Sequence, residues 1–285
     1  MSEYRDISAG LAARMALEKY GFRFSHALGQ NFILDDALID RILDAARIRP
    51  GENVLEIGPG AGVMTRHLAE RGARVTAIEL DRSLEPVLDS VLAGFDNVRI
   101  VYGDAMKLDI GEVMGGAPYR VVANLPYYIT ADVIVRLLTQ RSKPESLTIM
   151  VQKEAAERMM ARVGGKSWCQ LAATVQYFAD AQVLMTLPPE AFTPRPHVDS
   201  ALLGLRLYDD DDRPVTARDE KMLLRVVNAA FAMRRKTLAN NLSAAFPLDK
   251  AAAETQLAAL GLDPKIRGEA LTLTQLAALA DALGE

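Results

Sequence analysis

A loop with three alternating glycines could bind a nucleoside, because glycine permits a tight turn and leaves the backbone open to a ligand. The loop, Gly58-Pro59-Gly60-Ala61-Gly62, directly follows an apolar run that contains Glu56. Glu79, about twenty residues on, can accept hydrogen bonds from ribose hydroxyls. Asp104 can accept one from an adenine amino group. Each feature alone also fits a tight turn or a helix cap, but together they predict a nucleoside site.

The spacing of the glycines distinguishes between two kinds of nucleoside cofactor. Dinucleotide binders use G-x-G-x-x-G, which directs helix amides at a pyrophosphate. Here the spacing is G-x-G-x-G, and Pro59 removes one amide donor. The loop therefore predicts a cofactor without phosphates.

A second group of residues, Asn124-Leu125-Pro126-Tyr127, could activate an amine for nucleophilic attack. An exocyclic amine on a base is a poor nucleophile, because its lone pair is delocalised into the ring. The amide oxygen of Asn124 and the main-chain carbonyl of Leu125 could hold its hydrogens and direct the lone pair. Tyr127 could stack on the base, worth about 1–3 kcal/mol. Alone the tetrapeptide fits a simple turn, but its place after a strand beside the glycine loop favours a reaction site.

Further candidates lie in a proline-rich loop and in basic segments. Residues 188–200 form a stiff loop whose one aromatic residue, Phe192, is expected to form a second wall for the target base. The alternative is a rigid arch before the last strand. The formal net charge of -4 requires any RNA contact to be local. The basic candidates for RNA contact are Arg234, Arg235, Lys236 and Lys153, although such residues also fit a solvated face.

Alternating short apolar runs and helical periods after about residue 50 predict βαβ units. The fold expected is an α/β, doubly wound, mostly parallel seven-stranded sheet of the Rossmann-like class. Strands are predicted at residues 53–57, 74–79, 98–101, 120–123, 146–151, 182–186 and 201–207. Helices are predicted between the early strands, including residues 63–71 and 82–93.

The last part of the chain predicts a separate helical domain. Residues 209–214 combine an aspartate run with a proline, which is typical of a linker. Helices are expected at residues 217–233, 236–245, 251–260 and 273–283, the last with a capping box formed by Thr272 and Gln275. We therefore predict a catalytic domain over residues 1–208 and a helical domain over residues 209–285.

Composition limits the remaining classes. The chain has one cysteine and three histidines in 285 residues, so neither a disulfide nor a metal site is expected. The start of the sequence has no basic segment leading into an apolar run, and no window has the length of a membrane span. We expect a cytoplasmic protein without membrane contact, working as a monomer.

With these motifs in place, the sequence resembles the bacterial 16S ribosomal RNA adenine dimethyltransferases (KsgA type) along nearly its whole length. The glycine loop is similar to the first motif of S-adenosylmethionine methyltransferases. The Asn124 tetrapeptide is similar to the Asn/Asp-Pro-Pro-Tyr motif of amine methylases. The matching segments are residues 28–35, 56–62, 79, 103–104, 124–127, 151–154, 188–200, 231 and 234–238.

The resemblance implies S-adenosylmethionine as the cofactor, with Glu56 near its amino acid end. It also implies that Asn31 and the backbone of Ile33 cap the cofactor. Ile33 stands where the family usually has leucine, which leaves a backbone contact intact. The other implied contacts are Gly58, Gly60, Glu79, Asp104 and Asn124. The implied substrate is a pair of adjacent adenosines in a hairpin loop near the 3′ end of 16S rRNA, dimethylated during assembly of the small ribosomal subunit.

Three alternatives to this function are considered. A methylase of the erythromycin-resistance type shares the Asn-Leu-Pro-Tyr turn but modifies large-subunit RNA. The segments at residues 28–32 and 234–237 favour the small-subunit enzyme. A protein-glutamine or free-metabolite methylase normally has a second proline where Leu125 stands. A role as an assembly factor that binds the immature subunit could coexist with catalysis.

Overall fold

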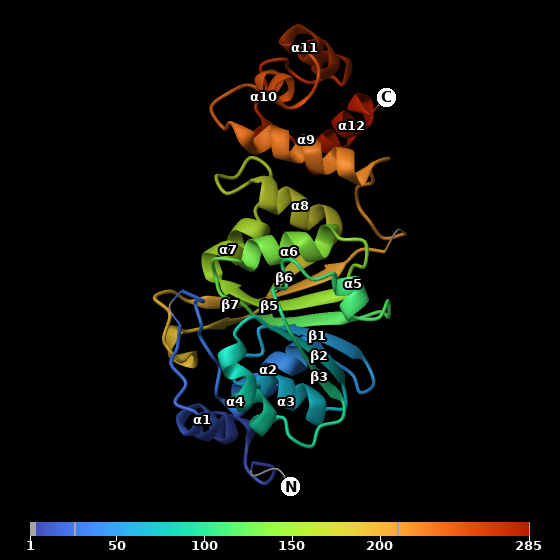
Figure 1. Ribbon diagram of the computed structural model, residues 1–285. Helices are drawn as coiled ribbons and strands as arrows, with labels where there is room; N and C mark the ends of the chain where they lie inside the picture. The colour runs from blue at the N-terminus through green and yellow to red at the C-terminus, as the bar shows by residue number, and fades with distance from the viewer. Residues whose placement is uncertain (1–3, 26, 210, 285) are drawn as a thin grey trace. The chain divides into compact units, whose positions relative to one another are not determined.

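The computed structural model describes residues 4–25, 27–209 and 211–284, and a seven-stranded sheet lies at its centre (Figure 1). The strand order is β3-β2-β1-β4-β5-β7-β6. All pairs from β3 to β5 are parallel, and β7 runs antiparallel to β5. The strands are β1 (Asn53–Ile57), β2 (Arg74–Glu79), β3 (Val98–Tyr102), β4 (Arg120–Asn124), β5 (Ser146–Gln152), β6 (Ala179–Leu187) and β7 (Ser200–Leu207). The predicted α/β doubly wound sheet is confirmed.

The register of the central strands aligns the ends that carry the candidate residues. Ile57, the last residue of β1, pairs with Ile78 of β2 on one side and Ala123 of β4 on the other. Glu79 and Asn124 each lie one residue further along. Strand order reverses at β1, and ligands bind at this point in doubly wound sheets.

Helices cover both faces of the sheet, with α2, α3 and α4 on one face and α6 on the other (Figure 1). The helices that precede residue 160 in the sequence are α1 (Ala9–Lys19), α2 (Asp36–Ala46), α3 (Val63–Glu70), α4 (Glu85–Val91), α5 (Ile110–Val113), α6 (Thr130–Thr139) and α7 (Lys153–Met159). The helical stretch predicted over residues 82–93 is present, but it consists of two elements and ends two residues earlier. A 3-10 turn, η1 (Arg82–Leu84), comes first, with Asp81 accepting a hydrogen bond from the Ser83 amide, and Pro86 stands at the start of α4. Proline suits a first helical turn better than a helix interior.

The carboxy-terminal helices belong to a second compact unit. Its helices are α8 (Gln170–Phe178), α9 (Glu220–Ala232), α10 (Leu238–Ala245), α11 (Lys250–Ala259) and α12 (Leu273–Leu283). The capping box of Thr272 and Gln275 at α12 is confirmed. Two short 3-10 turns complete the elements of the chain, η2 (Pro189–Ala191) and η3 (Gly268–Ala270). The described residues of 209–214 form no helix or strand, and Asp210 lies outside the described residues.

The second unit also includes a segment from the middle of the chain. The first unit comprises residues 1–156 and 182–207, and the second comprises residues 157–181 and 208–285. Trp168 holds the middle segment in the second unit: its indole nitrogen donates to the Leu271 carbonyl at 3.2 Å, and its ring meets Phe231 edge-on. The division into domains at residues 1–208 and 209–285 stays a prediction.

Candidate active site

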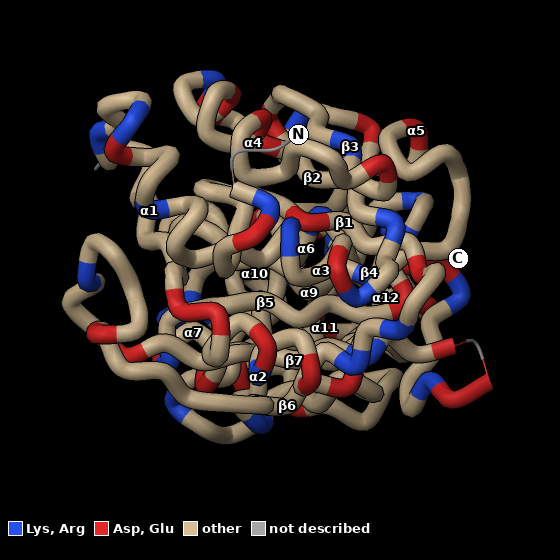
Figure 2. The backbone as a smooth tube through the Cα atoms, turned by 90° about the horizontal axis from the view of Figure 1, so that it is seen from below, with Lys and Arg blue, Asp and Glu red and all other residues tan. Residues whose placement is uncertain are grey.

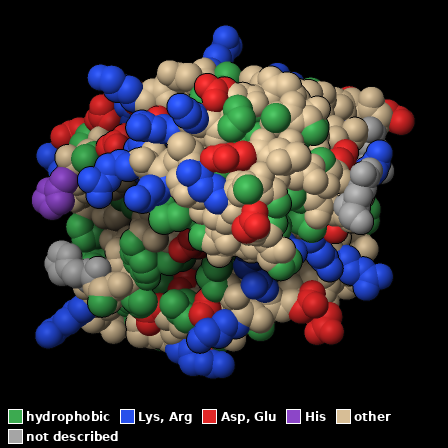
Figure 3. Space-filling view, turned by 90° about the horizontal axis from the view of Figure 1, so that it is seen from above, with side chains coloured by type: hydrophobic (Ala, Val, Ile, Leu, Met, Phe, Trp, Pro, Cys, Tyr) green, Lys and Arg blue, Asp and Glu red, His purple; other side chains and the backbone are tan. Residues whose placement is uncertain are grey.

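The carboxyl ends of β1, β2 and β4, with the turn after β3, line a cavity in the first unit. Its walls comprise residues 28–34, 56–64 (without Gly62), 78–80, 103–106 and 124–126, together with Ile39, Leu84, Tyr128, Ile129 and Val133. Most of these side chains are apolar, and the acidic ones lie at the strand ends. The face drawn in Figure 3 is hollowed where hydrophobic side chains surround a few acidic ones. An apolar cavity with few convergent polar groups is typical of a small-molecule site.

The glycine loop approaches the opposite wall too closely for a side chain. Gly58 and Gly60 have φ of 73° and 56°, in the left-handed region that favours glycine. A Cβ added to Gly60 would lie 2.8 Å from the ring of Phe32. The loop therefore requires glycine both for its backbone conformation and for this contact.

Glu56 is a buried carboxyl group that no donor satisfies. It is 1% exposed and lines the cavity. Neither of its oxygens has a hydrogen-bond partner among the described residues. Burial raises the pKa of Glu56 to about 8, with a further increase from Glu79 and partial opposition from the nearby Thr65 hydroxyl. A buried polar group without a partner is costly in a folded protein, and a cationic ligand group would relieve this one.

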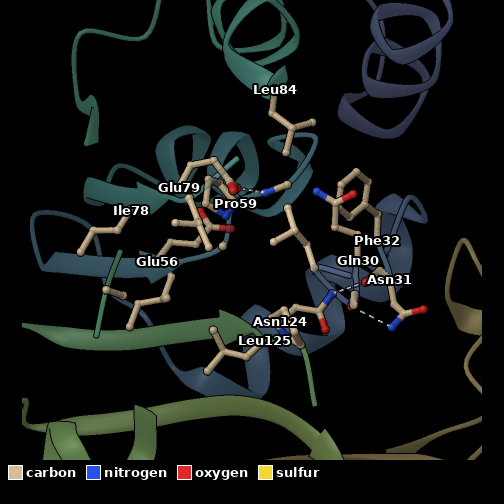
Figure 4. A pocket seen from close by; sticks show the side chains of 18 of the residues that line it. Gln30, Asn31, Phe32, Glu56, Pro59, Ile78, Glu79, Leu84, Asn124 and Leu125 are labelled. Carbon is tan, nitrogen blue, oxygen red and sulfur yellow. Dashed lines mark hydrogen bonds between the residues drawn. The ribbon is translucent and has the colours of Figure 1, made fainter. Parts of the chain in front are cut away.

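Glu79 connects the glycine loop to the turn that follows β2. Its two oxygens accept hydrogen bonds from the Gly60 amide at 3.2 Å and the Asp81 amide at 2.7 Å. Burial raises the pKa of Glu79, and these backbone donors partly oppose the increase. Figure 4 shows the Glu79 carboxylate directed at the glycine loop.

Asp104 lies in the cavity wall, but its side chain also stabilises a local turn. One oxygen accepts from the Met106 amide at 2.9 Å, and the other lies 3.5 Å from the Lys107 ammonium. No helix begins at this turn, because α5 starts only at Ile110, so the side chain does not cap a helix. A contact from Asp104 to a bound adenine stays a prediction.

The segment that carries Asn31 and Ile33 is held over the cavity by bonds to three distant parts of the chain. Asn124 donates its side-chain amide to the Asn31 carbonyl at 2.7 Å (Figure 4). Gln30 donates to Asp81 at 2.7 Å. Phe32 pairs with Thr193 through two backbone bonds of 2.8 Å. Asn31 and Ile33 both line the cavity, and their role in capping a bound cofactor stays a prediction.

The bond to Asn31 fixes the orientation of the Asn124 amide. Because the nitrogen donates to a carbonyl, the amide oxygen is the atom left to accept hydrogens from a ligand. Leu125, whose carbonyl is the second predicted acceptor, is 3% exposed and is held within the turn. The Pro126 carbonyl accepts from the Thr130 hydroxyl at 3.0 Å, which ties the turn to α6.

Tyr127 borders a second hollow that shares Gly29, Gln30 and Asn31 with the first cavity. Phe24, Gln152 and the residues from Pro194 to Val198 form its other walls. Stacking of a base on the Tyr127 ring stays a prediction.

Phe192 does not line either hollow. Its side chain is 2% exposed and packs in the hydrophobic core of the first unit. Two backbone hydrogen bonds between Thr193 and Phe32 fix the backbone directly after Phe192. The role of Phe192 as a second wall for the base stays a prediction, and it requires the side chain to become exposed.

The basic candidates for RNA contact fall in both units. Lys153 is exposed at the start of α7, in the first unit. Arg234, Arg235 and Lys236 are exposed in the loop between α9 and α10, in the second. Arg234 lies 3.7 Å from Glu269 and donates to the Lys166 carbonyl at 3.4 Å. RNA contact by these four residues stays a prediction.

The lining residues that were not identified as site residues from the sequence include Leu80, Met106 and Tyr128. Leu80 and Tyr128 are 53% and 61% exposed. Leu80 directly follows Glu79, and Tyr128 directly follows Tyr127. The sequence could therefore have indicated these two residues only through their position next to a predicted site residue.

The described residues contain neither a cluster of metal ligands nor a helix that could span a membrane. In residues 4–25, 27–209 and 211–284, no group of three or more His, Cys, Asp and Glu side chains is arranged to hold a metal ion. In the same residues, no helix has the length and apolarity needed to cross a membrane.

The strand order, the antiparallel β7 and the cavity at the carboxyl ends of β1 and β2 define a class I methyltransferase fold. The family model described as ribosomal RNA adenine dimethylase matches residues 21–279. The chain therefore belongs to the ribosomal RNA adenine dimethylase family, and the expected family is confirmed.

One curated relative supports this assignment, and two solved structures share the fold. The chain is 42% identical over 288 residues to ribosomal RNA small subunit methyltransferase A of Geobacillus kaustophilus, covering 98% of each chain. Among solved structures, a dimethyladenosine transferase from Plasmodium falciparum matches with a TM-score of 0.68 at 24% identity, covering 86% of this chain and 94% of that one. The 23S rRNA methyltransferase ErmE matches with a TM-score of 0.64 at 26% identity, covering 90% of this chain and 100% of that one.

Proposed function

We propose that the protein uses S-adenosylmethionine to dimethylate the N6 amines of two adjacent adenosines in a hairpin loop near the 3′ end of 16S rRNA. It acts on the small ribosomal subunit during assembly, in the cytoplasm and as a monomer. The family and the relative named for the small subunit, 42% identical over nearly the full chain, support this substrate. The observation that carries the reaction is the fixed orientation of the Asn124 amide beside the cavity.

The residues of the cavity fit S-adenosylmethionine. This cofactor has an amino acid end with an ammonium group and a carboxylate, a nucleoside end and no phosphates, and when bound it supplies an activated methyl group. The buried and unpartnered Glu56 suits the ammonium group. Glu79 suits the ribose, and Asp104 suits the adenine amine. Gly58 and Gly60 allow close approach of the backbone, and the segment with Asn31 and Ile33 closes over the site.

The chain's own residues position the target amine. The Asn124 amide oxygen and the Leu125 carbonyl accept its two hydrogens, which directs the nitrogen lone pair at the methyl group. Tyr127 stacks on the extruded base and offsets part of the unstacking cost. No strong base is needed, because the amine loses its proton after attack. Catalysis rests on positioning.

The test is replacement of the acceptor. We expect Asn124→Ala to lower kcat for methyl transfer to undermethylated small subunits by about 100-fold. The Kd for S-adenosylmethionine, measured by calorimetry, should change only a few-fold, because the other cavity contacts remain. The matched control is Asn53→Ala, which removes an asparagine from the opposite end of β1, where it donates to the Pro118 carbonyl at 2.9 Å. Near-normal transfer by Asn124→Ala would refute the proposal.

A large-subunit substrate is the second candidate, because ErmE shares the fold at 26% identity. The higher identity to the small-subunit relative argues against it. Parallel assays with small and large subunits distinguish the two, and transfer to large subunits alone would favour the second candidate.

A further inference from the structure

A buried serine holds the far end of the Tyr127 side chain. Ser200 is the first residue of β7 and is 0% exposed. Its hydroxyl lies 2.5 Å from the hydroxyl of Tyr127. The two residues are 73 positions apart in sequence, so this contact joins the Asn124 turn to the strand that follows the proline-rich loop.

Ser200 is itself fixed by the sheet. It pairs with Gln152 in the antiparallel ladder of β5 and β7. The amide of Lys153 donates to the carbonyl of the preceding residue, Asp199, at 3.0 Å. The serine hydroxyl therefore projects from a backbone position with little freedom to move.

The Tyr127 ring is consequently anchored at both ends. Its backbone follows Pro126 in a turn tied to α6 by the Thr130 hydroxyl, and its hydroxyl is bound to Ser200. Tyr127 lines the second hollow together with Phe24 and Gln152. Burial raises the pKa of Tyr127, partly opposed by the Ser200 bond, so the hydroxyl remains protonated at neutral pH.

We propose that Ser200 is a positioning residue for methyl transfer, which holds the Tyr127 ring at the orientation needed to stack on the target adenine. A phenylalanine would offer the same stacking surface without an anchor. This role accounts for the hydroxyl at position 127, which stacking alone does not require. The inference rests on the proposed function, since it concerns the same adenine.

The test compares Ser200→Ala, Tyr127→Phe and the double variant. Each single change removes the same hydrogen bond, and Tyr127→Phe retains the ring. We expect each to lower kcat for transfer to small subunits by about tenfold, the order of loss that a small misplacement causes. The double variant should lose no more than either single one. The Kd for S-adenosylmethionine should not change.

Tyr20→Phe is the matched control, because the Tyr20 and Ser90 hydroxyls form a similar pair at 2.8 Å on the surface. Neither residue lines either hollow, and kcat should not change. The inference would be overturned if the single variants kept the wild-type kcat and showed only a lower unfolding temperature. Ser200 would then have a structural role alone. Losses that multiply in the double variant would also overturn it. A wild-type protein that methylates no small subunits would instead overturn the proposed function.

Discussion

Glu56 is the residue with the strongest physical reason to have a ligand, because it is buried in the cavity wall without a hydrogen-bond partner among the described residues. In the unfolded chain it loses its proton near pH 4.5, whereas burial raises its pKa in the folded protein to about 8. Between these two pH values Glu56 is protonated in the folded protein and ionised in the unfolded chain. The free energy of unfolding therefore falls as pH rises through this interval.

We expect Glu56→Gln to flatten this decline, because glutamine cannot ionise. Urea unfolding at several values between about pH 4.5 and about pH 8 measures the slope. Some decline should remain in the variant, because burial also raises the pKa of Glu79. An exposed glutamate, Glu157, provides the control as Glu157→Gln, which should keep the wild-type slope. If the free energy of unfolding of Glu56→Gln fell with pH as steeply as that of the wild type, the raised pKa of Glu56 would not be the cause of the decline.

Sequence reasoning identified Glu79 at the end of a predicted strand and Asn124 directly after another, whereas Glu56 was identified through the resemblance to the family. It could not identify what each side chain contacts. The Glu79 bond to Gly60, the Asn124 bond to Asn31 and the Tyr127 bond to Ser200 all join segments that only tertiary packing brings together. For the same reason the core position of Phe192 could not be inferred from its loop.

At the scale of elements, the glycine loop and the segment around Phe32 face each other across the cavity entrance. Gly60 and Gly94 both have positive φ, at 56° and 89°. A Cβ at Gly60 would meet the Phe32 ring at 2.8 Å, whereas one at Gly94 would have no atom within 4 Å. A substitution at Gly94 therefore introduces backbone strain alone, whereas a substitution at Gly60 introduces both strain and steric overlap.

We expect Gly60→Ala to weaken S-adenosylmethionine binding by more than about tenfold, because Phe32 and the segment that carries Asn31 must shift. Gly94→Ala should cost about 1 kcal/mol of stability through backbone strain and leave the affinity unchanged. Calorimetric titration and urea unfolding of both variants measure these effects. Equal affinity in the two variants would show that the contact with Phe32 does not shape the cofactor site.

Most strands could be predicted because short apolar runs between turn signals are a local property. Strands β1 and β2 have the predicted bounds, and β3, β4, β5 and β7 differ by one residue at one end. Strand β6 begins at Ala179 rather than at residue 182, directly after α8. The placement of residues 157–181 with the carboxy-terminal helices depends on the contacts of Trp168, which no local pattern encodes.

At the scale of the whole molecule, a net charge of -4 means that RNA binding depends on local groups. Figure 2 shows basic and acidic positions interspersed along the backbone rather than separated. Arg234 is partly neutralised by Glu269. Neither Arg235 nor Lys236 has an ion pair in the part of the chain that the structure describes.

We therefore expect Arg235 and Lys236 to neutralise more RNA phosphates than Arg234. In the double alanine variant, the slope of log Kd for small subunits against log salt should fall by about 0.7–0.9 for each phosphate that the protein no longer neutralises. Lys250→Ala is the control, since Lys250 is exposed in the same unit and lies 3.5 Å from Glu254. Identical slopes for the wild type and the double variant would exclude these two residues from RNA contact.

The identity of the methylated nucleotides tests the central claim most directly. Mass spectrometry of ribosomal RNA from cells lacking this protein should find two adjacent adenosines near the 3′ end of 16S rRNA without their N6 methyl groups. A plasmid copy of the wild type should restore both dimethyl modifications, and Asn124→Ala should not. Unaltered 16S rRNA in the deletion strain, or absence of methylation only in large-subunit RNA, would contradict the account.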